Sequence, residues 1–388
     1  MSAPVLRFKE FDDSWDLKKL DQIAEVNPKT KELPSSFFYI DLESVSEGLL
    51  IQRKKIDINE APSRAQRLLE KSDVLFQMVR PYQQNNFYFD LDGDYVASTG
   101  YAQIRTKLNS KYIYYVLHSK KILDEVINRC TGTSYPAINS SELSGIEVAF
   151  PSIREQTKIA SFFSAVDEKI NQLTQKHQLL SQYKQGMMQK LFSQQIRFKA
   201  DDGSEFSEWS FSKLNNYINE SKDKSKYQDE YDVLTSSRKG LIKQTEYFED
   251  SRLADRDNIG FNIIKQNEIT YRSRSDDGLF FFNLNKLGIT GIISTYYPVI
   301  NMKNSDNRFF HAYLNFHKHE YVKYAVGTSQ LVLSLNELRN MKFYIPCLAE
   351  QTKIANFLSA IDQKIEVTAQ QIEQAKQWKK GLLQQMFV

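Results

Sequence analysis

The chain has 388 residues, of which 41% are hydrophobic and 26% are charged, a composition that is typical of a globular protein and excludes a disordered or fibrous one. Its length predicts two or three domains. The formal net charge of +3 identifies no polyanionic partner, so any nucleic acid would be bound through local patches or together with a partner protein.

The sequence predicts a cytoplasmic protein that binds no membrane. No stretch approaches the ~18 apolar residues of a membrane span, and the mean hydropathy is −0.51. The first ten residues hold no apolar run, so we expect no signal peptide. The two cysteines, Cys130 and Cys347, are far apart, which excludes a disulfide framework and a cysteine-based zinc site.

Residues 1–151 are predicted to form a first mixed α/β domain. An amphipathic helix is expected over 111–129, because its apolar residues recur every three or four positions. Four short runs rich in aromatic and aliphatic residues are typical of strands, and they lie at 37–42, 73–79, 95–98 and 103–106.

A polar and aromatic loop follows the second of these strands. Arginine can bond to guanine through two donors, and Gln or Asn can bond to adenine, so the loop suits contacts with DNA bases. Ordinary surface loops have a similar composition, and this alternative stays open. The candidate contacts are Arg80, Tyr82, Gln83 and Asn85.

Residues 152–198 are predicted to form a long helix. Glu155 stands three residues after Ser152, the spacing of a capping box. From Val166 onward, seam residues recur in steps of four and three, the heptad pattern of a coiled coil. Lys184 interrupts this pattern, and Tyr183 is expected to take its place. The predicted apolar seam consists of Ile159, Phe162, Val166, Ile170, Leu173, Leu180, Met187 and Leu191.

Residues 199–346 are predicted to form a second mixed α/β domain. A helix is expected over 309–326, in the place of the helix at 111–129. Arg272 and Arg274 stand close to the position that corresponds to the first polar loop, and both are candidate base contacts. The strand-like runs lie at 231–234, 268–272, 279–283 and 290–294.

Residues 347–388 repeat the first long helix at an offset of 195 residues. Twelve of the sixteen positions in 155–170 are identical in 350–365. Two such halves predict an internal pseudo-twofold, with two mixed α/β domains held apart by two long antiparallel coiled-coil helices. The alternative is that each helix is an ordinary core helix of its own domain. The second seam consists of Ile354, Phe357, Ile361, Ile365, Ile372, Leu382 and Met386.

The α/β domains carry no recognisable catalytic motif. The sequence holds no glycine-rich phosphate loop, no dinucleotide fingerprint and no Asn/Asp-Pro-Pro-aromatic motif of an amino-methyltransferase. His311, His317 and His319 form only a weak metal signal, so we expect neither a metal site nor a catalytic residue. The domains differ strongly between the halves while the helices agree, which favours two recognition domains on a shared framework.

Two divergent domains, each followed by a helix that opens Glu-Gln-x-Lys-Ile-Ala, resemble the specificity subunit of type I restriction–modification systems. The resemblance covers essentially the whole chain. It extends to 98–101 and to the paired Gly-Thr-Ser sequences at 132–134 and 327–329. These features add the candidate DNA contacts Ser98, Thr99, Tyr101, Thr133, Ser134, Tyr135, Ser294, Tyr296, Thr328 and Ser329.

The resemblance implies that each α/β domain is a target-recognition domain for one half of a bipartite double-stranded DNA site. The repeated helices would dock two methyltransferase subunits that bind S-adenosylmethionine and methylate adenine N6. Restriction subunits would add translocation and cleavage with ATP and Mg²⁺, and this chain itself would bind no cofactor. The alternative is a structural coiled-coil scaffold without DNA sequence recognition.

Overall fold

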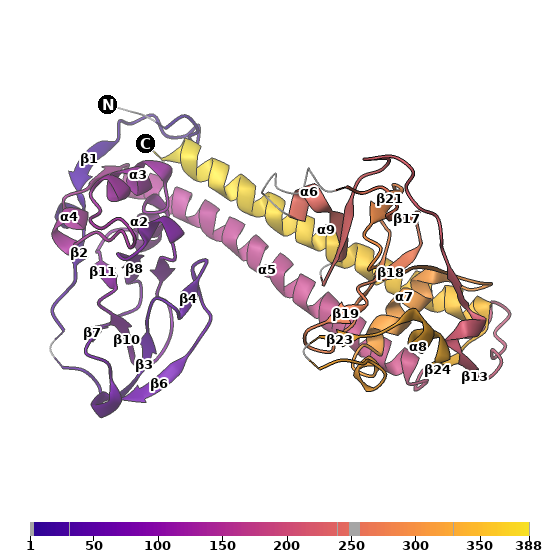
Figure 1. Ribbon diagram of the computed structural model, residues 1–388. Coiled ribbons are helices and arrows are strands. Elements are labelled where there is room, and N and C mark those ends of the chain that lie inside the picture. Colours follow the sequence, from indigo (N-terminus) through magenta and orange to yellow (C-terminus); the bar gives the residue numbers. More distant parts are fainter. Residues whose placement is uncertain (1–3, 31, 239, 248–256, 329, 388) are drawn as a thin grey trace. The chain divides into compact units, whose positions relative to one another are not determined.

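The computed structural model describes residues 4–30, 32–238, 240–247, 257–328 and 330–387, and it divides into two compact units (Figure 1). Unit 1 contains residues 1–175 and 369–388, and unit 2 contains residues 176–368. The helices α5 (Ile153–Phe192) and α9 (Leu348–Met386) each begin in one unit and end in the other. Each unit is therefore one α/β domain with the start of its own helix and the end of the other helix. The boundaries of the four predicted sequence segments stay a prediction.

The α/β domain of unit 1 contains two four-stranded sheets, of order β6-β3-β10-β7 and β2-β11-β8-β9, and the short ladders β1-β12 and β4-β5. Only β10 and β3 run parallel among the described pairs of this unit. The elements are β1 (Asp16–Lys19), α1 (Leu20–Ile23), β2 (Glu25–Val26), β3 (Ser36–Ile40), β4 (Val45–Ser46), β5 (Leu49–Leu50), β6 (Lys54–Asp57), η1 (Ile58–Glu60), β7 (Ala65–Leu68), β8 (Val74–Gln77), η2 (Pro81–Gln83), β9 (Phe87–Tyr88), β10 (Tyr95–Ser98), β11 (Tyr101–Arg105), α2 (Ser110–Val116), α3 (Lys120–Asn128), α4 (Ser140–Ser144) and β12 (Glu147–Phe150).

The α/β domain of unit 2 contains, within the described ranges, a four-stranded sheet of order β14-β22-β18-β20 and the ladders β13-β24, β15-β16, β17-β21 and β19-β23. The elements are β13 (Ser210–Lys213), η3 (Leu214–Asn216), β14 (Ile218–Glu220), β15 (Leu234–Ser237), β16 (Gly240–Lys243), α6 (Gln244–Tyr247), β17 (Asn262–Ile264), β18 (Ile269–Tyr271), β19 (Arg274–Ser275), β20 (Phe282–Leu284), β21 (Gly291–Ile293), β22 (Val299–Met302), α7 (Asn307–Phe316), η5 (Tyr321–Lys323), β23 (Leu331–Val332), α8 (Leu335–Asn340) and β24 (Lys342–Ile345).

The predicted mixed α/β class is confirmed, and four predicted elements are wrong in extent, among them the strand at 279–283, which begins only at Phe282 in β20. The single helix at 111–129 is two helices, because the Ser119 hydroxyl accepts a hydrogen bond from the Ile122 N–H and caps α3. The strand at 231–234 begins only at β15, after a turn in which the Asn258 amide bonds to Asp229. The helix at 309–326 ends at Phe316.

Each unit has its own hydrophobic core, and both cores include residues from α5 and α9. In unit 1 the core around Trp15 takes in Phe163 of α5 and Leu382 of α9. In unit 2 the core around Trp209 takes in Leu358 of α9. The ends of the long helices are therefore core helices of the domains, as the alternative interpretation of the sequence expected. The two helices also contact each other.

Glu155, at the start of α5, is the centre of a buried polar anchor in unit 1. Its carboxylate is 1% exposed and accepts hydrogen bonds from Arg7 at 2.7 and 2.8 Å and from Trp15 Nε1 at 3.2 Å. The predicted capping box is half wrong. The Ser152 hydroxyl accepts the Glu155 N–H at 3.4 Å, but the Glu155 side chain turns to Arg7 and Trp15 instead of the helix end.

Glu350, at the start of α9, forms the same anchor in unit 2. Its carboxylate is 0% exposed and accepts hydrogen bonds from Arg197 at 2.9 and 3.1 Å and from Trp209 Nε1 at 3.1 Å. The two anchors fix each long helix to the domain that precedes it. They explain why an acidic residue opens the repeated block.

The predicted seam residues lie on the buried or half-buried stripe of each helix, with one shift near the start. Phe163 and Leu358 are fully buried, whereas Phe162 and Phe357 lie one position aside and are half-buried. The other seam residues divide into two groups. Buried are Ile159, Val166, Leu173, Leu191, Ile354, Ile361, Leu382 and Met386; half-buried are Ile170, Leu180, Met187, Ile365 and Ile372.

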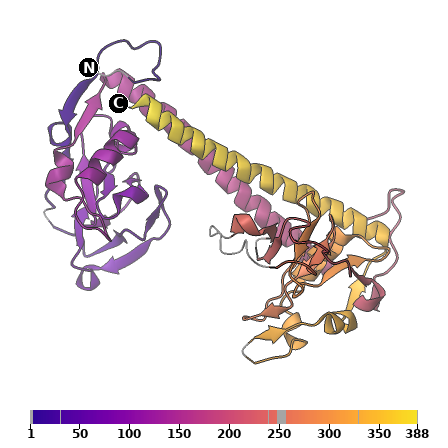
Figure 2. The same ribbon diagram turned by 45° about the horizontal axis from the view of Figure 1, so that its top comes forward.

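Within each unit the two helices run antiparallel. In unit 1, Phe163 of α5 stacks on Phe387, and Asp167 pairs with Lys379 at 2.6 Å, so one helix ascends as the other descends (Figure 2). In unit 2, Lys184 pairs with Asp362 at 2.5 Å. Tyr183 was predicted to take the place of Lys184 in the seam; its ring meets Phe357 of α9 at 6.4 Å but stays 52% exposed, and Lys184 keeps its own carboxylate partner.

Candidate nucleic-acid interface

A strained loop follows β8 in unit 1 and contains four of the predicted contacts. Arg80 and Gln84 have positive φ angles of 54° and 51°, a conformation that non-glycine residues rarely adopt. The η2 turn lies between them. The Tyr82 and Gln83 side chains are exposed, whereas Arg80 and Asn85 are half-buried. Such strain is typical of a loop whose shape serves a function.

A second loop, residues 131–137, lies against the first. The Arg80 N–H donates to the Pro136 oxygen at 2.8 Å, and the Arg80 guanidinium stands over the Tyr135 ring at 4.3 Å. Gly132 has a φ of +88° at the narrow turn. Thr133, Ser134 and Tyr135 are exposed at its tip. The structure thus brings both predicted loops of this domain together.

Unit 2 also sets an arginine-bearing segment against a Gly-Thr loop, but its arginine stands over a tyrosine from a third segment, between β21 and β22. Arg274 in β19 pairs with Val332 in β23, at the end of the loop that carries Gly327 and Thr328. The Arg274 guanidinium stands over the Tyr296 ring at 4.8 Å. Arg272, Arg274, Tyr296 and Thr328 are exposed, and Ser294 is half-buried. Ser329 lies outside the described residues.

Two predicted contacts are wrong. Ser98 is 4% exposed and its hydroxyl accepts the Gly100 N–H, while Tyr101 is fully buried in the core, where burial raises the pKa of its hydroxyl. Both faces of β10 and β11 are buried, so neither side chain reaches the surface. Thr99, between them, is half-buried and its N–H donates to the Arg64 oxygen. The motif at 98–101 is therefore mainly structural.

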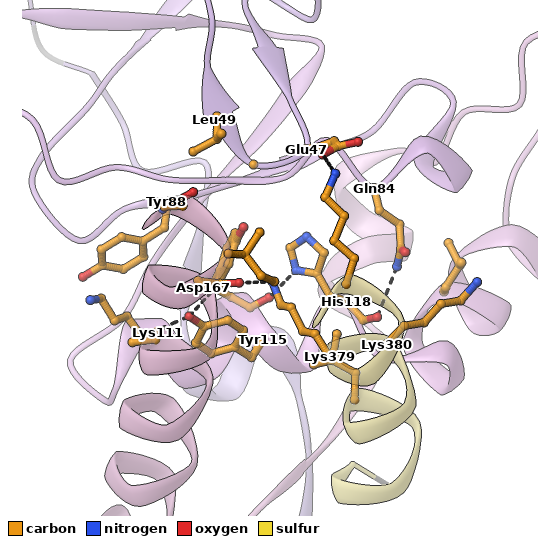
Figure 3. A pocket seen from close by; sticks show the side chains of 18 of the residues that line it. Glu47, Leu49, Gln84, Tyr88, Lys111, Tyr115, His118, Asp167, Lys379 and Lys380 are labelled. Carbon is orange, nitrogen blue, oxygen red and sulfur yellow. Dashed lines mark hydrogen bonds and ion pairs between the residues drawn. The ribbon is translucent and has the colours of Figure 1, made fainter. Parts of the chain in front are cut away.

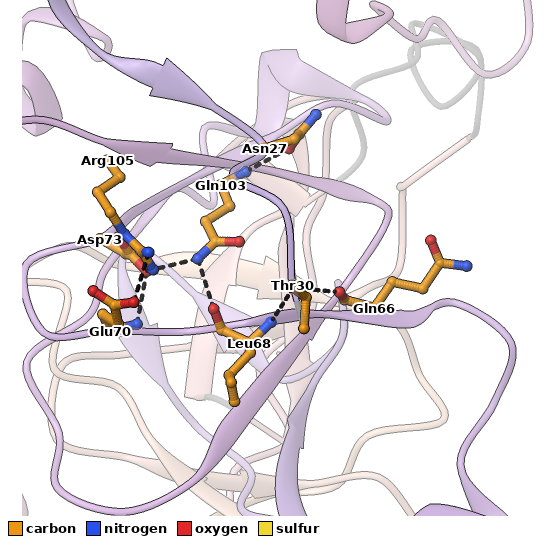
Figure 4. A network of polar contacts seen from close by, with 8 residues as sticks. All are labelled: Asn27, Thr30, Gln66, Leu68, Glu70, Asp73, Gln103 and Arg105. Atoms are coloured by element: carbon orange, nitrogen blue, oxygen red, sulfur yellow. Dashed lines mark hydrogen bonds and ion pairs between the residues drawn. The ribbon is translucent and has the colours of Figure 1, made fainter. Parts of the chain in front are cut away.

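A buried polar network supports the strand that leads to the first loop (Figure 4). Asp73, immediately before β8, is fully buried and accepts two hydrogen bonds from Arg105 at 2.8 Å and one from Gln103 at 2.7 Å. Gln103 also donates to the Leu68 oxygen. The carboxylate raises the pKa of Arg105, so the guanidinium stays charged. The network ties β8 to β11 and so positions the loop at the other end of β8.

A cavity of about 890 Å³ lies beside this loop, between α2, α3 and the end of α9 (Figure 3). Its wall holds two ion pairs to α9, Lys379 with Asp167 at 2.6 Å and Lys376 with Glu47 at 2.5 Å. His118 also lines the cavity, where burial lowers its pKa to about 4 and keeps the ring neutral. The two ion pairs in the cavity wall therefore join α9 to α5 and to the turn between β4 and β5.

Sequence reasoning missed four exposed basic side chains in the first α/β domain. Arg53, Lys54, Lys55 and Arg64 are exposed, and none has a carboxylate within 4.0 Å among the described residues. Strand β6 carries the two lysines at the edge of its sheet. The run Arg-Lys-Lys at 53–55 was the available signal. Unpaired cations suit phosphate contacts, which position a duplex without reading its sequence.

The described ranges show neither a metal-binding cluster nor a membrane-spanning helix. No group of three or more His, Cys, Asp or Glu side chains lies close enough to hold a metal ion there. No described helix is long and apolar enough to span a membrane.

The family model of the type I restriction modification DNA specificity domain matches the chain twice, over residues 12–182 and 207–377. The chain therefore belongs to this family. The two matches stand at the 195-residue offset of the internal repeat, so each one covers an α/β domain and most of the helix that follows it. The predicted resemblance is confirmed.

Two relatives from Methanocaldococcus jannaschii support the assignment. The chain is 26% identical over 297 residues to a protein named putative type I restriction enzyme MjaX specificity subunit. The alignment covers 72% of this chain and 67% of the relative. It is 23% identical over 403 residues to the type I restriction enzyme MjaVIII specificity subunit, which covers 91% of this chain and 85% of the relative.

Solved structures share the fold. The S subunit of the type I restriction-modification system from M. genitalium superposes with a TM-score of 0.61 at 16% identity, over 100% of this chain and 99% of that chain. A chain from a study of complex assembly and conformational transition of the type I R-M system gives a TM-score of 0.57 at 20% identity, over 96% and 97% of the two chains.

Proposed function

We propose that this chain selects the DNA target of a type I restriction–modification complex. Each α/β domain reads one half of a bipartite double-stranded site through the loops described above. The observation that carries this proposal is that each unit sets an arginine-bearing segment against a Gly-Thr loop, with the arginine over an exposed tyrosine and with different neighbouring side chains. A common framework with different exposed groups suits two different half-sites.

The exposed chemistry of the loops supports sequence reading. Arginine, glutamine and asparagine side chains are the donors and acceptors that discriminate base edges, and serine, threonine and tyrosine hydroxyls suit phosphates. The exposed Arg53, Lys54, Lys55 and Arg64 would add phosphate contacts on the same domain. Binding should therefore weaken with salt while the preferred sequence stays the same.

The long helices would dock two methyltransferase subunits and, through them, restriction subunits. The twelve identities among the sixteen positions 155–170 and 350–365 fit a partner that binds in two copies. Those partners would carry S-adenosylmethionine for adenine N6 methylation, and ATP with Mg²⁺ for translocation and cleavage. This chain would contribute no catalytic group and bind no cofactor, and the complex would act in the cytoplasm.

The test is methylome sequencing of a host that expresses the chain with its methyltransferase subunit. A second host expresses a chain in which residues 205–345 come from a relative with another target. We expect a bipartite methyladenine motif of which only one half changes. If the assembled complex yields no motif that depends on this chain, the proposal is wrong and a structural scaffold explains the fold better.

A further inference from the structure

Gln77, the last residue of β8, has an amide whose orientation is set by two backbone groups. Its side chain is buried at 1% exposure. Its Nε2 donates to the Val79 carbonyl oxygen at 2.8 Å, and its Oε1 accepts the Asn85 N–H at 3.0 Å. A carbonyl oxygen only accepts and an amide N–H only donates, so exchanging the nitrogen and oxygen of Gln77 would break both bonds.

This orientation determines how the Gln83 side chain is presented. The second hydrogen on Gln77 Nε2 points at Gln83, 2.8 Å away, so the facing atom of Gln83 must be its acceptor, Oε1. The Gln83 nitrogen then lies on the far side of the amide. The side chain is exposed, and no acceptor in the described part of the chain bonds to that nitrogen. Gln83 therefore offers two N–H donors to a ligand.

Asn85 is oriented in the same way by a different backbone group. Its Oδ1 accepts the N–H of Glu47, in the turn between β4 and β5, at 3.0 Å. No described acceptor bonds to its Nδ2, so this amide also keeps its donors free. Arg80, which carries donors alone, stands over Tyr135 beside these two residues. Arg80, Gln83 and Asn85 together form a surface that we call the donor loop.

We propose that the donor loop reads a base edge that carries acceptors, with guanine as the best match. Guanine presents two adjacent acceptors, N7 and O6, in the major groove, whereas cytosine presents the N4 donor there. Adenine pairs with an amide only if the amide oxygen and nitrogen both face the base. The Gln83 oxygen faces Gln77 and the Asn85 oxygen faces the Glu47 N–H, so these amides turn their nitrogens outward and guanine replaces the adenine expected from their residue types. The inference rests on the proposed function.

The test inverts the donor character of one side chain and measures the preferred base. The full-length chain, assembled with its methyltransferase subunits, is bound to duplexes with randomised half-sites, and bound sequences are counted. In Gln83→Glu one carboxylate oxygen still accepts from Gln77, but the other presents an acceptor outward. We expect the guanine-to-cytosine ratio at one position of one half-site to fall by about 5- to 150-fold, while the other half-site is unchanged.

Two further variants separate this effect from charge and from folding. Gln52→Glu adds the same charge to an exposed position of the same domain and should leave the preferred base unchanged. Gln77→Met removes the bonds that orient Gln83 at similar volume, and it should reduce discrimination at the same position, with thermal unfolding as the check on folding. If Gln83→Glu keeps the original base preference while both half-sites are still read, the donor loop is refuted and the proposed function stands. A wild-type complex without any sequence preference would refute both.

Discussion

The two units hold their helices with the same contacts but expose different side chains in their loops. The anchor of Glu155 with Arg7 and Trp15 in unit 1 reappears in unit 2 around Glu350. In each unit an arginine stands over a tyrosine and the Gly-Thr loop turns at a glycine with positive φ, but the amide-rich segment of unit 1 has an Arg-Ser-Arg segment in its place in unit 2. The duplicated chain has therefore kept the residues that hold the helices and has changed those that the loops expose.

The anchors should give the largest effect on stability. Glu350→Ala removes the acceptor for both Arg197 and Trp209 in a buried site, and we expect the free energy of unfolding to fall by about 3 kcal/mol. Glu155→Ala should cost a similar amount through Arg7. The control is Glu208→Ala, because this exposed partner of Arg197 should change stability by less than about 1 kcal/mol. Chemical denaturation measures all three, and a clear difference between Glu155 and Glu350 would break the equivalence of the anchors.

The turns of the second loops should differ in their tolerance of a side chain. A Cβ at position 327 would stand 2.2 Å from the Gln330 oxygen, whereas at position 132 the closest atom, the Tyr135 oxygen, would be 3.2 Å away. Both glycines have positive φ angles. We expect Gly327→Ala to cost about 2 kcal/mol of stability and Gly132→Ala about 1. Gly203→Ala, also at positive φ but in open space, is the control for backbone strain alone. Equal costs at 132 and 327 would show that contact with the turn is unimportant.

The arginines over tyrosines should affect DNA binding and leave the fold intact. Arg80→Ala should weaken binding of the specific duplex by about tenfold and relax the preference in one half-site, and Arg274→Ala should do the same in the other. Arg53→Ala, a predicted phosphate contact, should weaken all sequences equally and lower the salt dependence. Fluorescence anisotropy with duplexes that are altered in one half-site distinguishes these outcomes. Loss of preference in both half-sites from one substitution would contradict independent reading.

The ion pairs between the helices should have the smallest effect. Lys184→Glu breaks the pair with Asp362, and Lys379→Glu breaks the pair with Asp167, each at a cost of about 1 kcal/mol or less. The exchange of both residues in Lys184→Glu with Asp362→Lys should restore most of the stability. Asp167 also accepts a hydrogen bond from Tyr115, so the unit 1 pair should be the less sensitive to salt. Thermal unfolding at low and high salt tests this order.

The arrangement of domains and long helices could be predicted, because the internal repeat and the heptad spacing can be read from the sequence without knowledge of tertiary contacts. The choice between Phe162 and Phe163 could not, since both are aromatic and adjacent, and only packing against Phe387 selects Phe163. Lys184 looked like a break in the seam, because its partner Asp362 lies 178 positions further along the chain.

The candidate site shows the same division. Loop residues such as Arg80 and Tyr135 were found from composition and position, but their contact depends on tertiary structure. Ser98 and Tyr101 were misassigned because the sequence motif does not show that β10 and β11 lie inside the domain. Gln77 gave no signal, since a buried glutamine is recognised only by the bonds that it makes.

One contact near the chain ends has a consequence for how this protein can be rearranged. The Leu6 N–H donates to the Gln385 oxygen at 2.9 Å, so the described residues next to the two ends of the sequence lie together in unit 1. A short linker could join them, and a new start could be opened near residue 200, between α5 and β13. The circularly permuted chain would carry its two domains in the reverse order while every anchor and helix pair described above stayed in place.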